Sequence, residues 1–177
     1  MAHKAGYVNI IGSPNVGKST LMNQLVGERL SIITSKAQTT RHRIMGIVNN
    51  EDHQVVFSDT PGVLDPHYKL HENMMQFVNS ALKDADVILF VTDIYENGLN
   101  HQETFDRLQK TDIPILLLIN KIDQGDEPRI IEKIEYWQSV VDGTNKDEYP
   151  ETYKRATDSL KHFTNKQAEL DAVKVSL

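Results

Sequence analysis

The segment GSPNVGKS, residues 12–19, decides the fold of this 177-residue chain. It fits the pattern G-x-x-x-x-G-K-[ST] and stands between an apolar, β-branched run at residues 7–11 and a helical pattern at residues 18–25. In such a strand–loop–helix unit, the N–H groups of the loop and the positive end of the helix bind phosphate. A turn that fits the pattern by chance is the alternative, and the flanking elements argue against it. The predicted phosphate-binding residues are Gly12, Ser13, Pro14, Asn15, Val16, Gly17, Lys18, Ser19 and Thr20.

The phosphate loop and a second motif together predict a magnesium-bound nucleoside triphosphate. In a loop of this kind Lys18 bridges the β- and γ-phosphates, and the hydroxyl of Ser19 ligates Mg²⁺. A second motif, DTPG, ends a predicted strand, where the Asp59 carboxylate can hold a magnesium-bound water and the Gly62 amide can sense a γ-phosphate. Alone this motif is a common turn sequence. Its residues, with the one that follows, are Asp59, Thr60, Pro61, Gly62 and Val63.

A third motif, NKID at residues 120–123, selects the base. It follows an aliphatic strand, at the carboxyl edge where ligands bind in open α/β sheets. The Asp123 carboxylate only accepts hydrogen bonds, so it suits the N1–H and 2-amino donors of guanine, and adenine has no such pair. Asn120 would tie this loop to the phosphate loop, and the stem of Lys121 would cover the base. Each is an ordinary turn residue, but three motifs in this order indicate a guanine nucleotide.

The remaining pattern predicts an α/β fold in three layers, with a mostly parallel central sheet. The aliphatic run Ile113 to Ile119 predicts a central strand buried on both faces. A small polar segment at residues 31–40 predicts an exposed loop, which at this length is usually functional. The other expected elements are strands at 43–48, 54–58 and 87–91 and helices at 70–82 and 99–108.

Composition excludes several classes of protein. The chain has no cysteine, which excludes disulfides, cysteine-ligated zinc and a thiol nucleophile. No apolar run approaches the roughly 18 to 20 residues of a membrane span, so we expect a soluble, cytoplasmic protein, and a monomer. The net charge of −6 has the wrong sign to attract nucleic acid overall, although a local basic patch stays open. His67 and His71 lack the H-E-x-x-H pattern, and we predict no zinc site there.

From about Lys4 to Val141 the chain resembles the GTPase domain of the Era family, within the Ras-like P-loop GTPases. The resemblance rests on the three motifs and on SKAQTTRHR at residues 35–43. It implies hydrolysis of GTP to GDP and phosphate with Mg²⁺, and it makes residues 38–42 a first switch. There Thr39 or Thr40 would reach Mg²⁺ when GTP is bound. It also implies binding of 16S ribosomal RNA and assembly of the small ribosomal subunit.

The resemblance also bears on hydrolysis. Ras-like enzymes use a glutamine after the second motif to orient water, and Val63 cannot do this. Related GTPases with an asparagine at the position of Asn15 use it to hold K⁺, so we expect Asn15 to recruit K⁺; the alternative is that it only shapes the loop. Lys18, Asn15 and Thr40 are the predicted catalytic residues. Unassisted turnover should be slow, on the order of 10⁻⁴ to 10⁻² s⁻¹.

Two features depart from the Era pattern. The chain has no G-x-x-G loop, which KH domains use to clamp RNA, and it has no Ser-Ala pair, the last guanine-contacting motif, at the expected distance. We therefore expect a GTPase domain at residues 1–143 and an amphipathic helical tail at 144–177, which packs on the domain or mediates association. Residues 172–176 are either a displaced sixth strand or part of a frayed or helical terminus. The alternative function is a guanine-nucleotide-binding module that lacks turnover or RNA binding.

Overall fold

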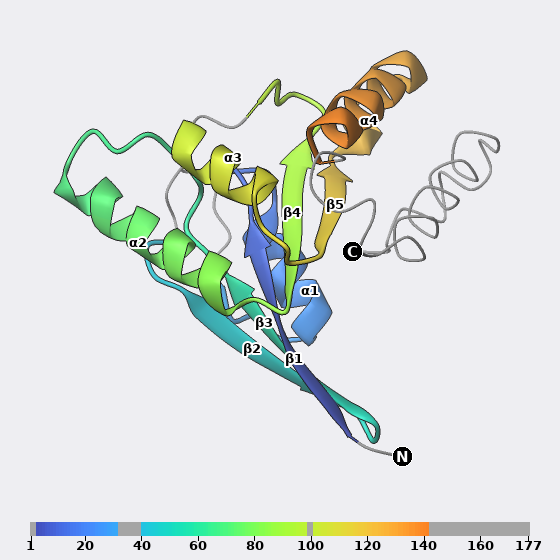
Figure 1. Ribbon diagram of the computed structural model, residues 1–177. Coiled ribbons are helices and arrows are strands. Elements are labelled where there is room, and N and C mark those ends of the chain that lie inside the picture. The colour runs from blue at the N-terminus through green and yellow to red at the C-terminus, as the bar shows by residue number, and fades with distance from the viewer. Residues whose placement is uncertain (1–2, 32–39, 99–100, 142–177) are drawn as a thin grey trace.

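The computed structural model describes residues 3–31, 40–98 and 101–141, and within them it confirms a three-layer P-loop GTPase fold (Figure 1). Every strand and helix predicted in these ranges is present, although several bounds differ. The elements, in chain order, are β1 (Lys4–Ile11), α1 (Lys18–Val26), β2 (Ile44–Asn49), β3 (His53–Asp59), α2 (Lys69–Asp84), β4 (Val87–Asp93), α3 (Gln102–Gln109), β5 (Ile115–Asn120), a 3₁₀ helix (Ile122–Gln124) and α4 (Glu127–Val141).

The sheet has the order β2-β3-β1-β4-β5. The hairpin strand β2 runs antiparallel to β3, and the other pairs are parallel. The register places Ile10 beside Asp59, and Asp93 beside Asn120. The carboxyl ends of four parallel strands therefore meet at one edge, which is where open α/β sheets bind ligands.

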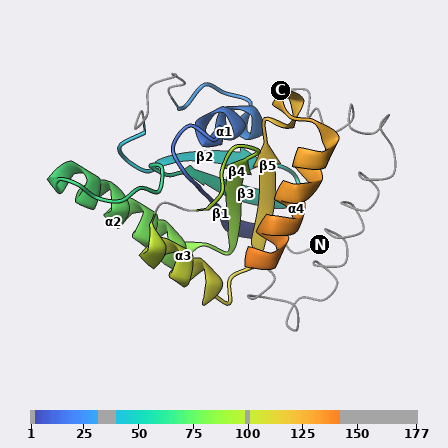
Figure 2. The ribbon, with the colours of Figure 1, turned by 90° about the horizontal axis from the view of Figure 1, so that it is seen from above.

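Helices cover both faces of the sheet. Seen from above, α1 lies on one side and α2 and α3 lie on the other (Figure 2). Alternate residues of β4 explain this arrangement, because Leu89 and Val91 pack with α1 whereas Ile88 and Phe90 pack toward α2 and α4. A parallel strand buried on both faces reads as a continuous apolar run, as β4 does.

The predicted position of the aliphatic strand at residues 113–119 is wrong for the described sheet. β5 pairs with β4 and forms the edge of that sheet, and Leu116 is 43% exposed. An apolar run indicates that the two faces of a strand pack against helices. It does not indicate whether the strand is central in the sheet or at its edge. Here Leu117 and Ile119 pack against the core on the side of α2 and α4.

Two helices also differ from expectation. The weak helix predicted from residue 99 begins at Gln102, because the His101 ring nitrogen Nδ1 accepts the Thr104 N–H and caps the helix there. The helix α4 was not expected from the sequence. Its Pro128 suits the first turn of a helix, and the ring of Trp137 is fully buried against Phe90, with ring centroids 5.3 Å apart.

Several predictions fall outside the described residues. They concern the first-switch residues up to Thr39, the helical tail at 144–177 and the alternative strand at 172–176. Within the described ranges, no helix combines the length and apolar character that crossing a membrane requires.

Candidate nucleotide-binding site

The phosphate loop is closed around the side chain of Lys18. The ammonium donates hydrogen bonds to the carbonyl oxygens of Gly12, at 3.0 Å, and Ser13, at 2.7 Å. Lys18 is 6% exposed and stands in the first turn of α1, whose positive end faces the loop. Val16 is buried among the residues between α1 and the sheet, so it anchors the loop from below. The half-buried Thr20 follows in the same turn of α1.

Burial lowers the pKa of Lys18 from 10.5 to about 8, and the nearby carboxylates of Asp59 and Glu96 oppose this shift only in part. A buried ammonium without a close counter-ion is costly. Phosphate oxygens would supply the missing negative charge. The loop is therefore built so that an anion stabilises the protonated lysine.

Three oxygen-bearing side chains gather beside Lys18. The hydroxyl of Ser19 donates to Asp59 Oδ2 at 2.6 Å and lies 3.0 Å from the hydroxyl of Thr40. Thr40 is also 3.4 Å from the same carboxylate oxygen. Asp59 is fully buried, and its second oxygen, Oδ1, has no hydrogen-bond partner among the described residues. Two hydroxyls and a buried carboxylate with an unused oxygen form a hard donor set that suits Mg²⁺.

The second motif packs directly under the phosphate loop. The Thr60 hydroxyl donates to the carbonyl of Ile10 at 2.7 Å, and the N–H of Val63 donates to the carbonyl of Gly12 at 3.0 Å. A Cβ on Gly62 would lie 2.7 Å from Pro14 Cα, so only glycine permits this approach. Thr60, Pro61 and Val63 are all buried. These contacts therefore hold the second motif against the phosphate loop.

The third motif is attached to the phosphate loop by Asn120. Its Nδ2 donates to the carbonyl of Val16 at 2.8 Å, which is the link expected from the sequence. A Cβ on Gly17 would lie only 2.3 Å from this nitrogen. Gly17 is thus required for the contact between the two loops, in addition to its positive φ of 103°. Asp123 is exposed on the 3₁₀ helix and forms no hydrogen bond or ion pair with the described residues, so its carboxylate is available to a base.

Asn15 stands at the tip of the phosphate loop. It is exposed and has φ 64°, a left-handed conformation that asparagine tolerates better than most residues. Its side chain has no hydrogen bond to the described residues. Both expectations for Asn15 are compatible with this position, because the backbone shape and a free amide oxygen are present together.

Sequence reasoning missed two acidic residues near this site. Asp93 ends β4 and Glu96 lies in the turn that follows, where its carboxylate accepts a hydrogen bond from Thr92 Oγ1 at 2.7 Å. Burial, reinforced by the nearby charge of Asp93, raises the pKa of Glu96 above its ordinary value, although the Thr92 hydroxyl and Lys18 favour its ionised form. The signal for Asp93 was present, since VILFVTD ends on a polar residue in the same way as ILLLIN ends on Asn120.

His67 and His71 lie close together near the start of α2. His67 precedes α2, and its N–H lies 3.4 Å from His71 Nδ1. Across the described ranges, no three histidine, cysteine, aspartate or glutamate side chains converge in the way a metal ion needs.

Comparison with known proteins agrees with this geometry. The model of a family described as 50S ribosome-binding GTPase matches residues 7–121. GTPase Era of Lactobacillus delbrueckii subsp. bulgaricus is 45% identical over 138 residues, which is 78% of this chain and 46% of that protein. A solved structure of Era in complex with MgGDPNP and nucleotides 1506–1542 of 16S ribosomal RNA has a TM-score of 0.71 and 38% identity, covering 80% of this chain and 49% of the other.

A more distant solved structure is also similar. NFeoB from S. thermophilus, bound to GDP·AlF4⁻ and K⁺, has a TM-score of 0.53 and 28% identity, covering 67% of this chain and 45% of the other. The chain spans about half the length of the curated relatives it matches. Because the family model covers more than half of it, the chain belongs to the 50S ribosome-binding GTPase family and contains an Era-type GTPase domain.

Proposed function

We propose that this chain binds GTP with Mg²⁺ and hydrolyses it to GDP and phosphate. The main support for this proposal is the oxygen cluster beside the buried Lys18. In this cluster the hydroxyls of Ser19 and Thr40 lie next to Asp59, whose Oδ1 has no partner among the described residues. Lys18 would hold the phosphates, and the other three would hold the metal directly or through water. Of the two switch threonines, Thr40 lies within the described residues, and its hydroxyl is 3.0 Å from Ser19 Oγ. Bound Mg²⁺ would supply positive charge to the transferring phosphoryl group.

At the other end of the site, we assign guanine recognition to the loop after β5. The exposed Asp123 carboxylate would accept from the two donors on the guanine edge. Asn120 would keep this loop at a fixed distance from the phosphates through its bond to Val16. We propose that residues 1–143 form the domain that binds the nucleotide and that residues 144–177 form a separate tail.

The direct test is GTP turnover by the whole chain, measured beside Lys18→Ala. We expect phosphate release on the order of 10⁻⁴ to 10⁻² s⁻¹, as for unassisted GTPases, and no release by the variant. One observation favours a second candidate, a nucleotide-binding module without turnover. Val63 is fully buried, so this position offers no side chain to orient water. Tight GDP binding with turnover no faster than Lys18→Ala would support that candidate.

We also propose that Asn15 recruits K⁺ during hydrolysis. Its support is an exposed amide without a partner in the described residues, and the K⁺ in the similar NFeoB structure. Turnover in K⁺ should exceed turnover in Na⁺ at equal ionic strength, and Asn15→Ala should remove the difference. Equal rates in the two salts would refute this role.

For a partner, we propose the small ribosomal subunit, because the similar Era structure contains a 16S ribosomal RNA fragment. This chain carries a net charge of −6, whereas strong binding to nucleic acid depends on lysine and arginine that neutralise its phosphates. We therefore expect weak, salt-sensitive binding to that RNA alone. Co-sedimentation with small subunits in GTP analogue and in GDP would test the proposal, and equal absence from both pellets would refute it.

A further inference from the structure

An ion pair joins the ends of two neighbouring strands beside the proposed guanine site. Lys121 Nζ lies 2.6 Å from Asp93 Oδ2. The Asp93 side chain is 7% exposed and the Lys121 side chain 29%. A charge-assisted hydrogen bond with one partner buried is much less screened than a surface pair.

Asp93 is held rigidly on its own side. Its other oxygen, Oδ1, accepts the N–H groups of Tyr95 at 2.9 Å and Glu96 at 3.2 Å. Rotation of the carboxylate away from Lys121 would break these bonds as well. The turn after β4 thus presents a fixed negative charge to the lysine.

The backbone conformation of Lys121 does not favour a lysine at this position. Its φ of 58° and ψ of 30° are left-handed, a region that glycine and asparagine occupy more readily. The loop after β5 also lies close to the turn after β4. A Cβ on Gly125 would come within 2.7 Å of Ile94 Cδ1, and the Tyr95 hydroxyl donates to the carbonyl of Gln124 at 3.3 Å.

We propose that Asp93 is a positioning residue for guanine nucleotides, which acts by drawing the Lys121 ammonium aside so that the aliphatic stem covers the face of the base. This inference rests on the proposed binding of guanine by the loop after β5. The competing explanation is that Asp93 only caps the turn after β4. The two explanations differ in whether the effect of Asp93 depends on Lys121. A residue that only caps the turn would have the same effect without Lys121, whereas a positioning residue would not.

Nucleotides with and without a 2-amino group on the base distinguish the contribution of Asp93 from that of Asp123. A side chain that covers the face of the purine does not sense the 2-amino group, whereas the Asp123 carboxylate reads that group. Loss of the Asp93 contact should therefore weaken GDP and inosine diphosphate by the same factor. Their affinity ratio should stay at the wild-type value.

The experiment is a double-mutant cycle on the full chain, with GDP and inosine diphosphate as probes. Asp93→Asn keeps an oxygen to cap the turn and removes the charge, and Lys121→Met keeps an apolar stem and removes the ammonium. We expect Asp93→Asn to bind both nucleotides about tenfold more weakly, the loss typical of a charge-assisted hydrogen bond. In the Lys121→Met background the same change should have little further effect.

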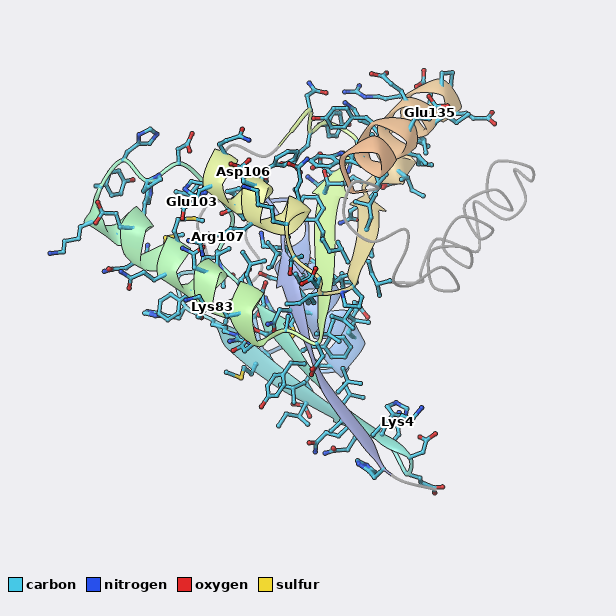
Figure 3. The ribbon with its side chains drawn as sticks, viewed as in Figure 1. Lys4, Lys83, Glu103, Asp106, Arg107 and Glu135 are labelled. Carbon is cyan, nitrogen blue, oxygen red and sulfur yellow. The ribbon has the colours of Figure 1, made fainter. Side chains whose placement is uncertain are left out.

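Glu103→Gln is the matched control. Glu103 pairs with Arg107 on α3, where both line the groove between α2 and α3 (Figure 3). Replacing this exposed charge by an amide should leave GDP affinity unchanged.

The possible results separate the role of Asp93 from the proposed binding of guanine nucleotides. Wild-type affinity for Asp93→Asn, an equal loss in both backgrounds, or a changed ratio of the two nucleotides would overturn the role of Asp93. If Asp93→Asn does not fold, unaltered GDP binding by Lys121→Met overturns it equally. Failure of the wild-type chain to bind GDP would instead refute the proposed function.

Discussion

Replacement of Gly17 by alanine should open the contact between the phosphate loop and the base loop. The new Cβ would lie 2.3 Å from Asn120 Nδ2, whereas ordinary contact begins near 3.4 Å, so the amide must retreat by about 1 Å. That movement breaks its 2.8 Å bond to the carbonyl of Val16, at a cost of about 1 kcal/mol. The positive φ adds about 1–2 kcal/mol for a residue with a Cβ. The free energy of unfolding should therefore fall by about 2–3 kcal/mol.

Gly27→Ala provides the matched comparison. Gly27 also has a positive φ, of 77°, but a Cβ there meets nothing within 4 Å. It should lose only the backbone contribution of about 1–2 kcal/mol. Urea unfolding followed by circular dichroism gives both values, and titration with a fluorescent GDP derivative gives the affinities. We expect GDP to bind Gly17→Ala at least about tenfold more weakly, a difference of about 1.4 kcal/mol, and Gly27→Ala as the wild type.

Equal losses of stability in the two variants, together with unchanged GDP binding by Gly17→Ala, would contradict this prediction. That result would mean that the bond between Asn120 and Val16 does not set the spacing of the two loops.

Three further predictions concern the charged groups. Because burial lowers the pKa of Lys18 to about 8, GDP binding should take up about half a proton at pH 8 and about a tenth at pH 7; affinity should fall as pH rises past 8. Calorimetry in buffers of different ionisation enthalpy measures this uptake, which Lys18→Met should abolish. Asp59→Asn should reduce the gain in GTP affinity from Mg²⁺ about tenfold or more, with an unchanged gain as the contrary result in titrations with and without EDTA. Arg43→Met should lower the free energy of unfolding by about 2–4 kcal/mol, since the Arg43 side chain is only 9% exposed and its guanidinium donates to Ser58, Asp84 and Asn9. A loss below about 0.5 kcal/mol in urea unfolding would contradict this.

The sequence was most informative where chemistry depends on residue type within one short segment. The phosphate loop has its strand and helix in place, and the amide of Asn120 does reach back to Val16. Such contacts follow from donor and acceptor groups at strand ends, which all lie at one edge of a parallel sheet.

Features that depend on packing between distant segments were not accessible in this way. The run at 113–119 indicates an apolar strand, but the edge position of β5 depends on which strands pair with it. A role for Asp93 can be inferred only from the fold, because the strand register places it beside Asn120 and its carboxylate contacts the ammonium of Lys121. Pro128 and Trp137 give a helix signal in α4, but only the fold shows that Trp137 completes the core beside Phe90.

Asp123→Asn tests whether the phosphate loop, the loop after β3 and the loop after β5 form one site for a guanine nucleotide. The change replaces an acceptor-only carboxylate by an amide that also donates, which suits the carbonyl at position 2 of xanthine. The measurement is the affinity of the wild type and the variant for GDP and xanthosine diphosphate. We predict that the variant loses GDP affinity by about 100-fold, or about 2.7 kcal/mol, and gains affinity for xanthosine diphosphate. Undiminished GDP binding by the variant would contradict the account.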